Sequence, residues 1–154
     1  MWKKADYDMQ VLDLFTASDG VVEGDALDNA IGMIASARRP LILAGRGAIR
    51  ARNQLIQLAD RLEAPLATTL QAKGLFSGHP YNIDIFGTLS TPAAYDLIAQ
   101  SDCIFCFGTA LHDFTTDRGM LMKDKRVIQI DTNLNAIGGG LHPDAALIAD
   151  AGLA

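Results

Sequence analysis

Five short apolar runs, spaced along the chain, constrain its fold more than any other feature of the sequence. Each run is almost wholly apolar, so it lacks the alternation expected of a strand with one solvated face. Such runs, separated by helical patterns or long connections, are typical of parallel strands that helices cover on both faces. The fold class is therefore α/β. The runs are residues 41–44, 66–68, 103–107, 127–130 and 145–149.

Helical patterns fill the connections between these runs. Apolar residues recur at helical spacing over residues 27–34 and again over residues 51–62. Thr91 followed by Pro92 is typical of an N-cap and a first helical position, and the pair predicts a third helix. The sequence thus alternates helices with strands, as doubly wound sheets do.

The first apolar run ends in Gly-Arg-Gly, residues 45–47, and leads into the second helical pattern. A strand that passes to a helix through glycines exposes backbone N–H groups at a helix N-terminus, where phosphate binds favourably. The sequence therefore predicts a nucleotide site. The full dinucleotide fingerprint is missing, because Arg50 stands where a third small residue is needed and the next strand ends in threonines instead of an acid. An ordinary NAD-dependent dehydrogenase is not expected.

The residues that follow the other runs also suit a nucleotide. Ligands of open α/β sheets collect at the carboxyl ends of the strands, where small residues admit phosphates and acids accept hydrogen bonds from ribose or adenine. The alternative is that the glycines make ordinary turns and the aspartates cap helices. The candidate cofactor-binding residues are Gly45, Arg46, Gly47, Thr69, Leu70, Gln71, Gly108, Thr109, Asp131, Thr132 and Asp150.

Composition narrows the classes of function. The chain has 154 residues, of which 49% are hydrophobic, and this suits one domain with a sizeable core. A net charge of −5, with scattered basic residues, argues against nucleic acid as a partner. No run approaches the roughly 18 apolar residues of a membrane span, and the N-terminus lacks the apolar core of a signal peptide. We therefore expect a cytoplasmic protein without a membrane partner.

The cysteines and histidines predict neither a redox site nor a metal site. Cys103 and Cys106 stand inside one apolar run, where residues three apart face opposite sides of a strand, so we expect two buried, reduced thiols. The histidines, His79, His112 and His142, are far apart in the sequence and lack the spacing of metal ligands. We expect no metal ion to be bound by this chain.

An ordered series of segments resembles the central domain of thiamine diphosphate-dependent enzymes, in the group of acetolactate synthases, oxalyl-CoA decarboxylases and 2-oxo acid decarboxylases. The resemblance implies a Rossmann-like parallel sheet of five to six strands with helices on both faces, of the DHS-like NAD/FAD-binding type. It runs from about residue 23 to residue 150. In order, the segments are RPLILAGRGA, LADRLEAPLATTLQAKGLFSGHP, the Asp-Ile-Phe-Gly segment at 84–87, SDCIFCFGT, KRVIQIDTN and LIAD.

The resemblance also implies which functions belong to other parts of such an enzyme. Members have three domains of related α/β build: the first supplies a glutamate that activates the thiazolium ring, and the third holds the diphosphate and magnesium through Gly-Asp-Gly. This sequence contains no Gly-Asp-Gly, so no catalytic residue is carried over and the isolated chain is expected to be inert. Thiamine diphosphate and Mg²⁺ belong to the full-length enzyme, which we expect to be a homo-oligomer with N- and C-terminal catalytic domains as this domain's partners.

Middle domains of this group bind FAD, bind ADP or bind no ligand. Residues 45–47 match the glycine loop of the flavin-binding members, and residues 69–71 match their Thr-Leu-Gln segment. The segment after Gly108 departs from their pattern, because Ala110 and Phe114 stand where acetolactate synthases carry arginines. Since arginine binds phosphate strongly, we expect ADP or another adenine nucleotide in this cleft, and FAD less tightly.

The sequence therefore predicts two segments and one favoured function. Residues 1–22 show no clear period and are expected to form an approach segment or interdomain linker, and residues 23–154 form the domain. The favoured function is the non-catalytic central domain of a thiamine diphosphate- and magnesium-dependent enzyme acting on 2-oxo acids, with a nucleotide-type cleft. The alternatives are a structural spacer with a vestigial cleft, or a free-standing small nucleotide-binding protein.

Overall fold

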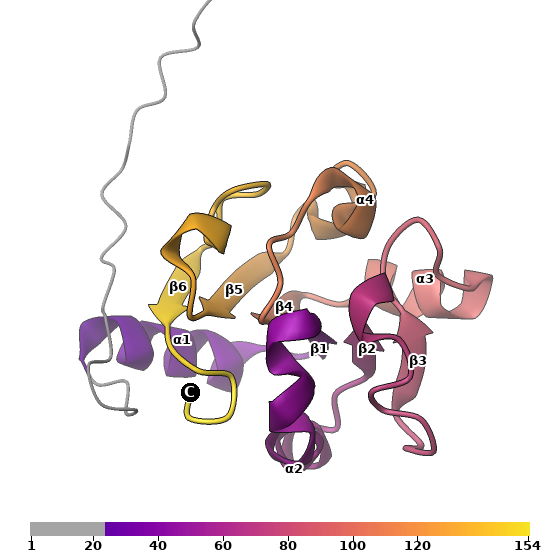
Figure 1. The fold of residues 1–154 in the computed structure, drawn as a ribbon, viewed down its shortest axis with the longest axis horizontal. Coiled ribbons are helices and arrows are strands. Elements are labelled where there is room, and N and C mark those ends of the chain that lie inside the picture. The colour runs from indigo at the N-terminus through magenta and orange to yellow at the C-terminus, as the bar shows by residue number, and fades with distance from the viewer. Residues whose placement is uncertain (1–23) are drawn as a thin grey trace, which may run out of the picture.

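The computed structural model describes residues 24–154 of the chain. The approach segment predicted for residues 1–22 lies outside the described residues. The described chain folds into one parallel sheet with helices on both faces (Figure 1). This arrangement confirms the α/β, Rossmann-like fold that the sequence predicts.

Six parallel strands form the sheet, in the order β3-β2-β1-β4-β5-β6. In this order the chain starts in the middle of the sheet, builds one half, and returns to build the other. All five predicted runs are strands, with ends within one residue of those expected. The strands are β1 (Pro40–Ala44), β2 (Leu66–Thr68), β3 (Asn82–Ile85), β4 (Cys103–Phe107), β5 (Arg126–Asp131) and β6 (Ala145–Ile148).

The sixth strand, β3, is not among the predicted runs. It lies at the edge of the sheet, and all of its residues are only half-buried. Its pairing with β2 shifts register between Leu66 and Ala67, and Asp84 has a φ of 64°. A bulged edge strand needs neither a continuous apolar run nor regular alternation, so periodicity does not reveal it.

The central strands are buried on both faces. Every residue of β4 is buried, and residues 41–44 of β1 are fully buried as well. A continuous apolar run has no polar face for water, so it is stable only with helices on both sides. Cys103 and Cys106 are free thiols that lie in the two separate halves of the core, on opposite faces of β4, as predicted.

One face of the sheet is covered by α1 (Asp25–Ser36) and α2 (Arg52–Leu62) (Figure 1). Their buried contacts come from Ala30 of α1 and from Leu55 and Ala59 of α2. These residues follow helical spacing, as the periodicity of residues 27–34 and 51–62 predicts.

The opposite face is covered by α3 (Pro92–Gln100) and by the segment that contains the short helix α4 (Asp113–Thr116). Ile98 of α3 is fully buried against the strands. The hydroxyl of Thr91 accepts the N–H of Ala94 at 3.2 Å, which confirms the predicted N-cap. Helices thus cover both faces, and the carboxyl ends of the strands stay accessible between them.

Candidate functional site

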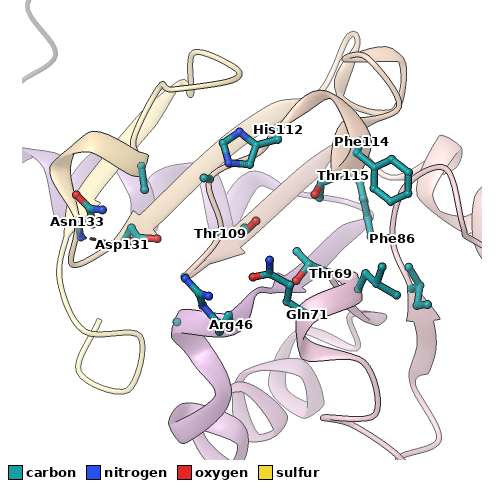
Figure 2. A pocket seen from close by; sticks show the side chains of 16 residues that line it. Arg46, Thr69, Gln71, Phe86, Thr109, His112, Phe114, Thr115, Asp131 and Asn133 are labelled. Carbon is teal, nitrogen blue, oxygen red and sulfur yellow. Dashed lines mark hydrogen bonds between the residues drawn. The ribbon is translucent and has the colours of Figure 1, made fainter.

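A cleft of about 540 Å³ opens at the carboxyl ends of the strands (Figure 2). It is lined by the segments that follow β1 and β4, the two neighbouring strands at which the strand order reverses. Ligands of doubly wound sheets bind at this reversal. The volume falls within the range of small-molecule sites, about 300–1,000 Å³.

The cleft brings together most of the candidate cofactor-binding residues. Three of them do not line it: Gly45 is buried, Thr132 is exposed, and Asp150 accepts the N–H of Gly152 at 2.8 Å in the C-terminal turn. The eight that line the cleft are Arg46, Gly47, Thr69, Leu70, Gln71, Gly108, Thr109 and Asp131.

The Gly-Arg-Gly loop differs from the phosphate loop that its sequence predicts. The Gly45 N–H donates to the Phe107 carbonyl at 2.8 Å, and the Gly47 N–H donates to the Gly108 carbonyl at 3.1 Å. Two of the loop's N–H groups therefore join β1 to β4 and do not point to a ligand. The chain then forms a 3₁₀ helix, η1 (Arg46–Ala51), before α2 begins.

Glycine is required where these two loops touch. A Cβ on Gly45 would lie 2.3 Å from the Gly108 oxygen, and a Cβ on Gly47 would lie 2.9 Å from the Gly108 Cα. Gly108 has a left-handed φ of 60°, and a Cβ there would lie 2.5 Å from the Ala48 nitrogen. The close backbone approach explains all three glycines without a ligand.

One side of the cleft is polar, and Figure 2 shows Arg46, Gln71, Thr109 and Asp131 around the same opening. Arg46 is exposed and forms no salt bridge with any other described residue. One oxygen of Asp131, Oδ1, accepts the Asn133 N–H at 2.8 Å, which leaves the other carboxylate oxygen for a further donor. This side offers one cation for an anionic group and one carboxylate for hydroxyl or amino groups.

The other side of the cleft is apolar, and most of its residues are not among the candidate cofactor-binding residues. Ile85 is the last residue of β3 and Phe86 follows it, and Phe114 from α4 is 56% exposed. The Thr88 hydroxyl donates to the Phe114 carbonyl at 3.4 Å and holds the segment after β3 beside α4. The Asp-Ile-Phe-Gly segment at residues 84–87, which carries part of the family resemblance, could have pointed to Ile85 and Phe86 as lining residues. The other lining residues outside the candidate set are Ala110, His112, Thr115, Asn133 and Ala136.

In the part of the chain that the structure describes, the titratable side chains outside the cleft do not gather into another candidate site. Among residues 24–154, no three His, Cys, Asp or Glu side chains are placed to hold a metal ion. Burial raises the pKa of the Cys103 thiol to about 11 and raises that of Cys106 still further. His79 lies 3.2 Å from the Asp60 carboxylate and links the segment after β2 to α2. None of the helices described is long and apolar enough to cross a membrane.

Residues 27–154 match the family model described as thiamine pyrophosphate enzyme, central domain. The chain belongs to this family. The match includes all six strands and every residue that lines the cleft. The resemblance read from the ordered segments of the sequence is therefore confirmed.

The proteins similar to this chain include a sulfoacetaldehyde acetyltransferase and acetolactate synthases. It is 37% identical to a sulfoacetaldehyde acetyltransferase of Rhodobacter capsulatus over 84% of this chain and 23% of the relative. It is 34% identical to a probable acetolactate synthase large subunit of Methanococcus aeolicus, over 82% and 22% of the two chains. It is also 34% identical to an acetolactate synthase of Mycobacterium bovis, over 79% and 20%. The chain thus spans about a fifth of the length of the curated relatives it matches.

Proposed function

We propose that this chain is the non-catalytic central domain of a thiamine diphosphate- and magnesium-dependent enzyme acting on 2-oxo acids, and that its cleft binds an adenine nucleotide such as ADP. Membership of the central-domain family supports the first part. The observation that carries the second part is the presence of Arg46 and Asp131 in one cleft at the reversal of strand order.

The chemistry of the polar wall fits a nucleoside diphosphate. The Arg46 guanidinium is a planar donor that matches phosphate oxygens, and such charge-assisted hydrogen bonds are among the strongest in proteins. The unused oxygen of Asp131 accepts hydrogen bonds from ribose hydroxyls or an adenine amino group. When bound, the nucleotide would add binding energy to the folded domain and take no part in the reaction.

FAD is the less favoured ligand of this cleft. Arg46 is the single Lys or Arg among the residues that line it. Ala110 and Phe114, which stand where acetolactate synthases carry arginines, both line the cleft and supply no charge. A flavin dinucleotide would therefore place its diphosphate beside one guanidinium only, and we expect FAD to bind more weakly than ADP.

The residues of this chain do not fit thiamine diphosphate with magnesium. The sequence has no Gly-Asp-Gly, and the described residues include no cluster of acids placed to hold a divalent cation. We propose that the N- and C-terminal catalytic domains of a homo-oligomeric full-length enzyme hold this cofactor. Calorimetry of the isolated chain with thiamine diphosphate and Mg²⁺ tests this: we expect no binding, and a micromolar affinity would contradict the assignment.

Thermal unfolding with and without ADP tests the nucleotide site. A ligand at about ten times its Kd stabilises the folded state by about 1.4 kcal/mol, which raises Tm by a few degrees. We expect ADP to raise the Tm of the wild-type chain and FAD to raise it less. Arg46→Gln should lose most of the ADP shift, because the diphosphate loses its cation.

Arg50→Gln is the matched control for that variant. Arg50 lies in the same 3₁₀ helix, is also exposed and does not line the cleft, so its replacement should keep the full ADP shift. Gly47 is a poor probe, because a side chain there meets Gly108 and disturbs the loops themselves. A domain that purifies yellow with bound flavin would reverse the order of ADP and FAD.

The two alternatives give different results. No response to ADP, FAD or coenzyme A at millimolar concentration would favour a structural spacer with a vestigial cleft. The coding region decides the other alternative: an upstream catalytic glutamate and a downstream Gly-Asp-Gly in the same reading frame would rule out a free-standing nucleotide-binding protein.

A further inference from the structure

A fully buried glutamine stands within the apolar run of β5. Gln129 stands between Ile128 and Ile130 and has no exposed surface. Burying an amide without hydrogen-bond partners costs several kcal/mol in general, so a glutamine in such a place needs donors and acceptors around it. The partners that it has therefore indicate what the side chain does.

All partners of the Gln129 side chain are backbone groups of two segments beside the cleft. Its Nε2 donates to the Thr109 carbonyl at 2.9 Å and to the Ala136 carbonyl at 2.8 Å. Its Oε1 accepts the Gly138 N–H at 3.0 Å. Thr109 follows β4, whereas Ala136 and Gly138 belong to the connection between β5 and β6. One side chain thus fastens two separate segments to each other.

Both of these segments line the cleft. Thr109 and Ala136 are themselves lining residues, and the same two segments contribute His112 and Asn133. Gln129 lies beneath them and does not line the cleft. It can therefore affect a ligand only through the position of the two segments.

A backbone contact nearby shows that the two segments fit each other closely. A Cβ on Gly140 would lie 2.3 Å from the Leu111 oxygen, so the connection packs directly on the segment after β4. Leu111 is buried and has a left-handed φ of 51°, which is an unfavourable conformation for leucine. Such a conformation persists only where the surrounding structure holds it, and here the core packing of Leu111, the Gln129 bond to Thr109 and the close approach of Gly140 surround the segment.

We propose that Gln129 is a positioning residue for the cleft: it fixes the segment after β4 against the β5–β6 connection, so that nucleotide affinity depends on a side chain that never touches the nucleotide. The identity of the ligand in this inference rests on the proposed function. The fastening of the two segments rests on the hydrogen bonds of Gln129 alone. Removing the amide should let the segments separate and misplace the groups around Asp131. Affinity should then fall more than the loss of stability alone explains.

Gln129→Met tests this, since methionine has a similar length but no donor or amide acceptor. Val127→Ala is the matched control, because Val127 is a buried residue of the same strand and the same face, and it does not line the cleft. Calorimetry with ADP should give at least a fivefold weaker affinity for Gln129→Met and a change within twofold for Val127→Ala. Hydrogen exchange should become faster at residues 109–112 and 136–138 in Gln129→Met only.

Equal ADP affinity in Gln129→Met and the wild-type chain would overturn the inference. If the wild-type chain itself does not bind ADP, the proposed function fails and hydrogen exchange decides the question of Gln129. Faster exchange in both segments of Gln129→Met, but not of Val127→Ala, then supports the fastening role, and unchanged exchange overturns it. If Gln129→Met does not fold, the same measurements are made on Gln129→Asn. This variant keeps the amide, but its shorter side chain cannot reach both segments.

Discussion

The Gly47 N–H donates to the Gly108 carbonyl at 3.1 Å, so the segments that follow β1 and β4 meet backbone to backbone at the floor of the cleft. The contact explains why a Gly-Arg-Gly sequence stands after β1 in a domain with no full dinucleotide fingerprint. Two glycines allow the backbones to touch, and Arg46 between them extends its side chain to the cleft lining. One short segment thus serves the packing of the sheet and supplies the cation of the proposed site.

Gly108→Ala should be strongly destabilising. Its φ of 60° is unfavourable for alanine, and the added Cβ would lie 2.5 Å from the Ala48 nitrogen and 2.6 Å from the Gly47 Cα. The conformational cost of about 1–2 kcal/mol adds to an overpacking cost of about 1–3 kcal/mol. We expect chemical unfolding to show a loss of about 3 kcal/mol.

Gly119→Ala separates the two costs of that substitution. Gly119 has a φ of 82°, but a Cβ there would meet no atom within 4 Å. Only the conformational cost remains, so we expect a loss of about 1–2 kcal/mol. Equal losses in the two variants would show that the β1 and β4 segments do not touch as described.

Both cysteines should resist thiol reagents in the folded chain. Cys103 and Cys106 are fully buried, and burial raises the pKa of Cys103 to about 11, so the reactive thiolate is scarce near neutral pH. We expect absorbance assays to show slow labelling in buffer and rapid labelling of both thiols in denaturant. Fast labelling of the native chain, or a disulfide between the two, would contradict their placement on opposite faces of β4.

The stabilisation that Asp102 provides should be lost in acid. Its carboxylate accepts the N–H groups of Arg38 at 2.9 Å and Arg39 at 3.0 Å. Burial acts to raise the pKa of Asp102, but these hydrogen bonds and the charge of Arg126 outweigh it and hold the pKa below the ordinary value of 3.8. Because the pKa is lower in the folded state, the stabilisation is present above about pH 4 and is lost as the pH falls through the folded-state pKa.

Urea unfolding of Asp102→Asn checks this dependence. Asparagine has one acceptor oxygen where the carboxylate has two, so one of the two backbone N–H groups loses its acceptor. We expect a loss of about 0.5–1 kcal/mol near neutral pH, reduced by solvent around the group. At about pH 3 the difference between the variant and the wild-type chain should shrink. A difference that stays constant with pH would show that the carboxylate charge contributes nothing to stability.

The sequence predicts the strands that are buried on both faces, because burial alone determines their apolar composition. Runs such as residues 103–107 are buried on both faces, so their composition is sufficient to identify them. Asn82–Ile85 is a half-buried edge strand whose pairing with β2 is irregular, and it depends on its neighbour more than on its own pattern. α4 has four residues, too few for helical periodicity to appear.

The candidate site was predictable where it depends on the ends of predicted strands. Arg46 lies in the loop that follows β1, and Asp131 is the last residue of β5. Both line the cleft. Phe86 was missed as a lining residue because it follows an unpredicted strand. Phe114 was named only as the residue that stands in place of an arginine, because packing sets the path of the connection that carries it. The N–H groups of Gly45 and Gly47 bond to the last residue of β4 and to the residue after it, and no local pattern reveals which loop packs beside a glycine.

Phe114→Arg should strengthen binding of ligands that carry a diphosphate, and it tests why FAD is the less favoured ligand. Phe114 lines the cleft and is 56% exposed, so its replacement should change the stability of the fold by less than about 0.5 kcal/mol. A second guanidinium in the cleft adds charge-assisted contacts worth about 1 kcal/mol at an exposed position, or about a fivefold gain in affinity. We expect calorimetry to show this gain for FAD and for ADP.

Phe114→Gln is the control for that gain, since it removes the ring and adds no charge. Its affinities for ADP and FAD should match or fall below those of the wild-type chain. Because exposed charges are screened by ions, the gain of Phe114→Arg should also shrink as salt is raised toward about 1 M. A gain of equal size in Phe114→Gln would mean that the phenyl ring obstructs the cleft, and that the missing positive charge is not what limits FAD binding.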